Sequence, residues 1–160
     1  LGKAEVRVYR PDGVLEAKIT GTSERPLDFV AALDIGPDNR LYIGDDPASM
    51  ANPANGQLLA PGRESRLLIY EINNVHPLVT NPNTGQADPS GVRKQPKFVK
   101  EFQVGVGNAG GLTVGADGII YLSEPWAGRV SKYNDQGKLL GTLPDFRLPD
   151  TALQTQNGVD

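Results

Sequence analysis

Short apolar runs alternate with turn residues along 108–143, and this spacing predicts a series of short β-strands. Turn signals lie at Gly115–Gly118 and Asn134–Gly137, and an Asp-Gly pair between β-branched runs favours a hairpin. Strands are therefore expected at 112–114, 119–122, 129–133 and 138–143. Four short strands joined by tight turns make an antiparallel meander, whereas no convincing helical pattern is found anywhere in the chain.

The same pattern occurs earlier in the chain. Leu33–Asp45 aligns without gaps with Leu112–Glu124, and Arg66–Tyr70 aligns with Arg129–Tyr133. Phe98–Val104 supplies the expected fourth strand of this earlier unit. A repeat of this length indicates similar supersecondary units that stack on one another.

The beginning of the chain matches the second half of a unit. Glu5–Leu15 aligns with Arg129–Leu139, so the first residues are expected to be the third and fourth strands of a unit. The expected units are 3–20, 27–104 with insertions at 47–64 and 73–96, 108–143, and a first strand at 155–160. Both insertions are rich in Pro, Asn, Gly and Gln, and loops of this length are usually functional or mobile.

These units resemble NHL repeats and, more loosely, the blades of the SMP-30/gluconolactonase group. The resemblance implies an all-β fold: an incomplete β-propeller of four-stranded antiparallel blades, about two and three-quarter blades long. Propellers of these families commonly have six blades. The resemblance therefore predicts either a piece of a longer polypeptide or an assembly of neighbouring copies through open sheet edges.

The amino-acid composition and charge disfavour several classes of function. The formal net charge is -3, from 16 Lys and Arg against 19 Asp and Glu, and the two signs are interspersed. This balance does not favour a nucleic-acid partner, and the apolar runs are too short to span a membrane. The chain has no Cys, which excludes disulfides, thiolate metal sites and Cys nucleophiles.

The resemblance also implies where a ligand would bind. In such propellers the loops between the second and third strands, and the links between blades, form one face. Trp126, Glu124 and Asn108 are the ligand-binding residues expected there. An aromatic side chain on such a loop is suited to recognition, although Trp126 is also compatible with simple packing.

A divalent cation, Ca²⁺ or another, is the cofactor that the sequence suggests. Asp45 and Asp46 are adjacent carboxylates at the end of an expected strand, and hard cations prefer oxygen ligands. The alternative is that the two acids cap a turn and stay solvated. The resemblance adds Asn157, which precedes a Gly as metal ligands of that family do, whereas the equivalent positions Gly110 and Ala31 have no ligating side chain.

The sequence gives little support for a catalytic or binding role of the other candidate residues. His76 is the only histidine, so a Ser-His-Asp arrangement would depend on it. It lies in an insertion expected on the opposite face, where a surface or packing role is favoured. Arg66 and Arg129 recur at the start of the third strand, which indicates a structural role. The tyrosines also recur with the repeat, which indicates packing.

The sequence thus favours a non-catalytic binding or structural module. Its expected partners are the rest of the propeller or neighbouring copies, and a small-molecule, glycan or protein ligand. The competing hypothesis is a metal-dependent SMP-30/gluconolactonase-like hydrolase or an NHL-type lyase. An extracellular or periplasmic location is expected from the family habit and the Asn/Gly/Pro-rich loops.

Overall fold

The computed structural model describes residues 4–9, 12–49, 56–58, 62–72, 96–106, 109–124 and 128–143. Within these ranges the chain contains β-strands and a single turn of 3-10 helix. The elements are β1 (Val6–Tyr9), β2 (Leu15–Ile19), β3 (Val30–Ile35), β4 (Arg40–Asp45), η1 (Pro47–Ser49), β5 (Glu64–Glu71), β6 (Lys97–Val106), β7 (Gly111–Val114), β8 (Ile120–Glu124), β9 (Arg129–Tyr133) and β10 (Leu139–Thr142). The expected all-β character is confirmed.

The described strands form three separate antiparallel sheets, of two, four and four strands. Their orders are β1-β2, β3-β4-β5-β6 and β7-β8-β9-β10, so each neighbour along the chain is also a neighbour in the sheet. Both four-stranded meanders were expected from the sequence. Most strand bounds differ from the expected ones by one or two residues, and β5 begins at Glu64, inside the expected insertion. The helical turn η1 lies at the start of that insertion.

Local turn chemistry explains why the strands end where they do. The carboxylate of Asp117 accepts a hydrogen bond from the backbone N–H of Ile119 at 3.0 Å, and Gly118 has a φ of +77°. In the β9–β10 turn, Asn134 accepts hydrogen bonds from the backbone of Gln136 and Lys138. Side-chain acceptors and left-handed glycines reverse the chain at little cost.

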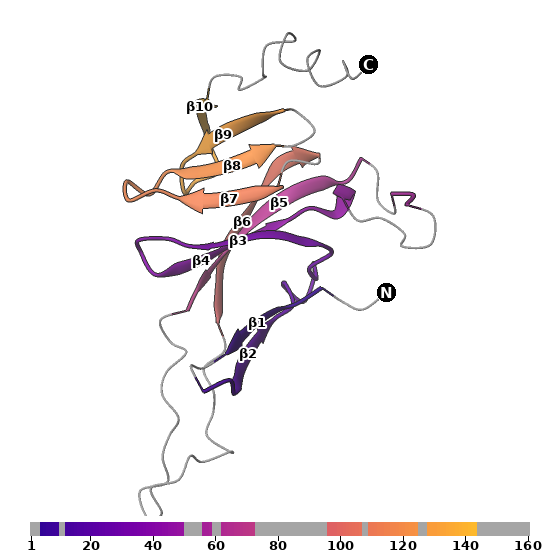
Figure 1. The fold of residues 1–160 in the computed structure, drawn as a ribbon, viewed down its shortest axis with the longest axis vertical. Helices are drawn as coiled ribbons and strands as arrows, with labels where there is room; N and C mark the ends of the chain where they lie inside the picture. Colours follow the sequence, from indigo (N-terminus) through magenta and orange to yellow (C-terminus); the bar gives the residue numbers. More distant parts are fainter. Residues whose placement is uncertain are drawn as a thin grey trace, which may run out of the picture.

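The three sheets are stacked in layers (Figure 1). The β3–β6 sheet lies in the middle, the β7–β10 sheet covers one of its faces, and the β1–β2 sheet covers part of the other. The central strands of the middle sheet are therefore buried on both faces, as the run Leu67–Tyr70 of β5 shows. By contrast, β8 alternates buried and half-buried residues because it packs on one side only.

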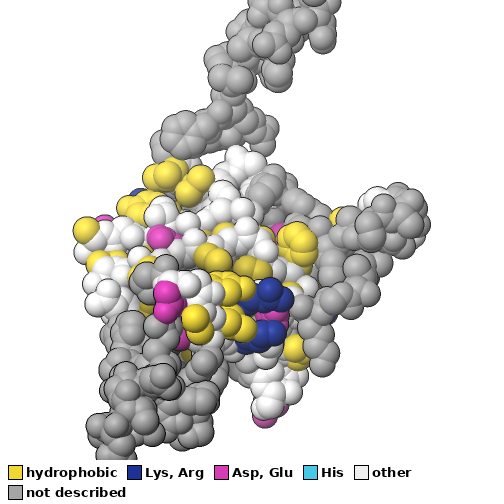
Figure 2. Space-filling view, turned by 60° about the horizontal axis from the view of Figure 1, so that its bottom comes forward, with side chains coloured by type: hydrophobic (Ala, Val, Ile, Leu, Met, Phe, Trp, Pro, Cys, Tyr) yellow, Lys and Arg dark blue, Asp and Glu magenta, His cyan; other side chains and the backbone are white. Residues whose placement is uncertain are grey.

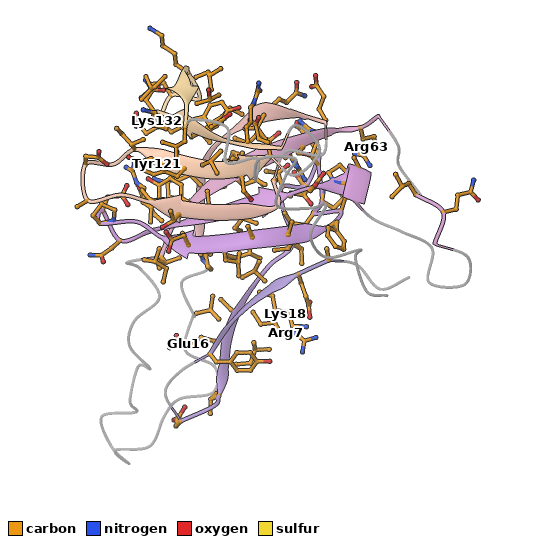
Figure 3. The ribbon with its side chains drawn as sticks, turned by 45° about the horizontal axis from the view of Figure 1, so that its top comes forward. Arg7, Glu16, Lys18, Arg63, Tyr121 and Lys132 are labelled. Atoms are coloured by element: carbon orange, nitrogen blue, oxygen red, sulfur yellow. The ribbon has the colours of Figure 1, made fainter. Side chains whose placement is uncertain are left out.

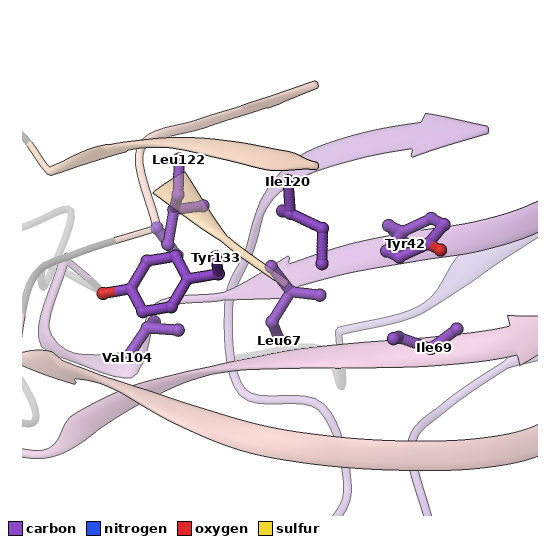
Figure 4. Packing of buried hydrophobic residues seen from close by; sticks show 8 residues of the cluster. Tyr42, Leu67, Ile69, Val104, Ile120, Leu122 and Tyr133 are labelled. Carbon is purple, nitrogen blue, oxygen red and sulfur yellow. The ribbon is translucent and has the colours of Figure 1, made fainter. Parts of the chain in front are cut away.

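A core cluster fills the space between the two four-stranded sheets (Figure 4). Tyr42, Leu67 and Ile69 of the middle sheet meet Ile120 and Leu122 of β8 there. A second cluster joins the opposite face of the middle sheet to the two-stranded sheet, and includes Val6, Ile19, Leu41, Ile43, Leu68 and Tyr70. Burying an aliphatic side chain of this size stabilises the fold by about 1.5–3 kcal/mol.

The first strands of the two four-stranded sheets, β3 and β7, lie side by side and are joined by hydrogen bonds. Asp34 Oδ2 accepts from the backbone N–H of Val114 at 2.7 Å and from Thr113 Oγ1 at 3.0 Å. The hydrogen bond from Val114 is the main cause that lowers the pKa of Asp34. Its carboxylate form therefore contributes to the contact between the sheets.

This lowered pKa gives a pH prediction. The contribution of Asp34 is present above its unfolded pKa of about 3.9, and is lost as the pH falls through the folded value. Asp34→Asn is expected to destabilise the protein at about pH 7, and the difference from wild type should shrink at about pH 3. Urea unfolding at both pH values measures it, and an equal difference at both would contradict the prediction.

No helix in the described part of the chain is long and apolar enough to cross a membrane.

Candidate functional site

The expected ligand face lies at the end of the sheets where β4 and β8 finish. At this end an acid and an arginine face each other across neighbouring strands in both sheets. Asp45 pairs in register with Arg66, and Glu124 pairs in register with Arg129. The two pairs occupy equivalent positions of the repeat.

The side chain of Asp45 is 0 % exposed, and protein donors surround both of its oxygens. Oδ1 accepts from the backbone N–H groups of Asp28 at 3.0 Å and Phe29 at 2.7 Å. Oδ2 accepts from Arg66 Nε at 2.9 Å and lies 2.9 Å from Arg66 Nη2. A carboxylate offers about four acceptor positions, and these contacts use all of them.

Arg66 connects this carboxylate to two further parts of the fold. Its Nη1 lies 2.8 Å from Glu101 Oε2 on β6, and its Nη2 donates to the carbonyl of Pro26 at 2.6 Å. Glu101 is also held by Arg25, at 2.8 Å. The guanidinium is 2 % exposed, so Arg66 acts as a buried junction between β4, β5, β6 and the segment before β3. The structural role expected for this arginine is consistent with these contacts.

Asp46 is also buried, and Ser65 Oγ donates to its Oδ1 at 2.6 Å. Its backbone N–H donates to the carbonyl of Phe29 at 2.8 Å. The alternative that the two adjacent acids stay solvated is therefore wrong. Long-range contacts withdraw both carboxylates from water, and a strand-end position alone did not indicate these contacts.

Glu124, expected to bind a ligand, is fully buried and has two side-chain partners. Tyr133 donates its hydroxyl to Oε1 at 2.9 Å, and Arg129 donates to Oε2. Burial, reinforced by this hydrogen bond, raises the pKa of Tyr133 to about 12. A binding role for Glu124 stays a prediction.

The other expected site residues lie outside the described residues. These are Asn108, Trp126, Asn157 and His76. Their roles therefore stay predictions.

A cation at Asp45 would have to replace donors that already satisfy its carboxylate. Within the described ranges, no group of three or more His, Cys, Asp or Glu side chains is placed to hold a metal ion. As placed, the surroundings of Asp45 fit a guanidinium and two backbone amides and do not fit Ca²⁺. The cation therefore stays a prediction that depends on Asn157 and on the family resemblance.

Sequence reasoning missed the pairing of these acids with the arginines. The alignment already placed Asp45 over Glu124 and Arg66 over Arg129. Reading these two recurrences together, as an acid that ends one strand and an arginine that begins the next, would have indicated an ion pair in each unit.

A second polar site lies at the opposite end of the sheets, between three turns. A cavity of about 290 Å³ opens there, lined by Pro37, Asp38, Tyr42, Asp117, Gly118, Ile119, Asn134 and Asp135. Asp38 Oδ2 accepts from the Tyr42 hydroxyl at 3.1 Å, and Asp135 is paired with Lys100 at 3.2 Å. Burial is the main cause that raises the pKa of Tyr42 to about 12. Asp38 and Asp117 also accept hydrogen bonds from the backbone N–H groups of Arg40 and Ile119, so both acids stabilise their turns.

Comparison with known proteins gave no match to a family model, a curated protein or a solved structure.

Two equivalent tyrosines give a stability prediction. Tyr133 donates to the buried Glu124, whereas the buried hydroxyl of Tyr70 has no hydrogen-bond partner among the described residues. Tyr133→Phe is expected to cost about 1–2 kcal/mol, because it removes a hydrogen bond to a carboxylate. Tyr70→Phe, the matched control, should change stability by less than about 0.5 kcal/mol or stabilise the protein. Urea unfolding of both variants measures the two losses of stability. Equal losses would contradict the hydrogen bond assigned to Tyr133.

Proposed function

We propose that the chain is part of a β-propeller that works as a non-catalytic binding or structural module, as its resemblance to NHL repeats implies. Two four-stranded meanders stacked face to face, with β3 beside β7, are the arrangement expected of adjacent blades. Equivalent acid–arginine pairs in both sheets add to this support.

The non-catalytic role is supported by the burial and pairing of the charged groups at the expected ligand face. Asp45 and Arg66 are buried and pair with each other across β4 and β5, and the buried Glu124 pairs with Arg129 on β9. General acid–base catalysis needs a titratable group within reach of its substrate. These residues instead hold neighbouring strands together, which suits a rigid module that presents its loops to a ligand.

The competing function is a metal-dependent SMP-30/gluconolactonase-like hydrolase or an NHL-type lyase. It depends on Asn157 and on the same resemblance. An extracellular or periplasmic location is part of the proposal and rests on the usual location of the protein families that the chain resembles.

A lactone-hydrolysis assay with and without Ca²⁺ tests the proposal. Wild type is expected to show no calcium-dependent hydrolysis above the buffer rate and no calcium-binding heat by titration calorimetry. Hydrolysis that requires Ca²⁺ and is lost in Asn157→Ala would overturn it. Gln103→Ala, at an exposed position of β6, is the matched control that should leave any such activity unchanged.

A further inference from the structure

One face of the middle sheet is covered over only part of its width. Leu41 and Ile43 on β4 are buried in the cluster below the two-stranded sheet. Leu33 pairs in register with Ile43, and Ile35 with Leu41, so these β3 residues belong to the same face. They are nevertheless 48 % and 58 % exposed. On this side of the molecule, hydrophobic side chains gather at the surface beside basic and acidic ones (Figure 2).

The repeat indicates what covers such positions. The residues equivalent to Leu33 and Ile35 in the second unit are Leu112 and Val114, and these pack against the core between the two four-stranded sheets. They are covered because the sheet facing them has four strands, with β3 beside β7 and Tyr42 on β4 in the same core. Among the described residues, the sheet that faces Leu33 and Ile35 has two strands. The part not covered corresponds to a pair like β3–β4.

The edge of β1 is where such a pair would join. Tyr9 aligns with Tyr133, so β1 corresponds to β9, which lies between β10 and β8. Among the described residues β1 has β2 as its only sheet neighbour, and its other edge corresponds to the place of β8. An open edge displays backbone donors and acceptors that pair with an added strand.

We propose that the open edge of β1, with Leu33 and Ile35 beside it, is a docking site for an antiparallel β-hairpin similar to β3–β4. One strand of the hairpin pairs with β1, and its aliphatic and aromatic side chains cover the two exposed β3 residues. This inference deepens the proposed binding role and rests on it. The face of the middle sheet that the hairpin would cover is continuous with the interface between the two-stranded and middle sheets.

A second copy of the chain stacked head to tail fits less well. The opposite end of the stack is the outer face of the β7–β10 sheet, where Figure 3 places Tyr121 and Lys132 far from Arg7 and Lys18 of the two-stranded sheet. Lys132 stands at the position of the buried Ile69 in the middle sheet. A charged residue there is a poor match for an apolar face, so the hairpin is the favoured occupant.

Binding of a fluorescent peptide of residues 27–46, the β3–β4 hairpin, tests this inference. Fluorescence anisotropy is expected to show saturable binding to the wild-type protein. The double variant Leu33→Asp/Ile35→Asp should weaken binding about tenfold or more. Leu139→Asp/Leu140→Asp, at similarly exposed leucines on β10, is the matched control and should bind as wild type does. Urea unfolding checks that both variants remain folded, as their exposure predicts.

Three results would overturn the proposal. They are absence of peptide binding, equal binding by the two double variants, and self-association of the peptide-free protein in light scattering that is lost in Leu33→Asp/Ile35→Asp. The last would assign the face to a second copy. Failure here is distinguishable from failure of the proposed function, because calcium-dependent lactone hydrolysis is measured without the peptide.

Discussion

Arg66→Met is expected to destabilise the protein by about 3–5 kcal/mol, because it leaves the buried carboxylate of Asp45 without its charged partner. Arg66 lies 2.9 Å from Asp45 and 2.8 Å from Glu101, and also donates to the carbonyl of Pro26. Methionine is close to the aliphatic part of arginine in size, so packing is largely preserved. Urea unfolding followed by circular dichroism measures the loss.

The repeat supplies a matched control for this variant. Arg129 makes the equivalent pair with Glu124, but its side chain is 44 % exposed, so solvent screens the interaction. Arg129→Met should therefore cost less than Arg66→Met, because Arg66 also joins Glu101 and the carbonyl of Pro26. The double variant Asp45→Leu/Arg66→Met should lose less stability than the two single changes added together, because no unpaired charge remains. Additive losses would contradict a buried ion pair.

Gly137→Ala is expected to destabilise the protein by about 2–4 kcal/mol, from overpacking together with backbone strain. Gly137 lies in the β9–β10 turn with a φ of +78°, where a side chain is strained. A Cβ there would lie 2.5 Å from Cγ of Phe102 on β6, so the turn and the middle sheet would have to separate. Urea unfolding measures this effect as well.

The variant Gly118→Ala distinguishes backbone strain from steric overlap with a neighbouring side chain. Gly118 has nearly the same φ, +77°, in the β7–β8 turn, but a Cβ there would have no atom within 4 Å. Its replacement should cost only about 1–2 kcal/mol, the strain of a left-handed alanine. Equal losses for the two variants would show that Phe102 does not press on the turn.

The sequence predicted the strands well because their ends depend on neighbouring residues. Asp117–Gly118 and Asn134–Gly137 reverse the chain through side-chain acceptors and left-handed glycines, which operate within four residues. Bounds that depend on distant partners were predicted less well. β5 begins at Glu64 because Glu64 pairs with Val106 of β6, far along the chain, and not because of any local signal.

The candidate site was less predictable because its electrostatics come from the tertiary structure. The sequence by itself determined the repeat, the all-β meanders and the positions where an acid ends one strand and an arginine begins the next. Only the tertiary structure decided that Asp45 is buried, because its donors come from the segment before β3 and from β5. A carboxylate at a strand end is solvated, bound to a cation or paired according to the groups that packing brings to it, and here packing brings a guanidinium and two backbone amides.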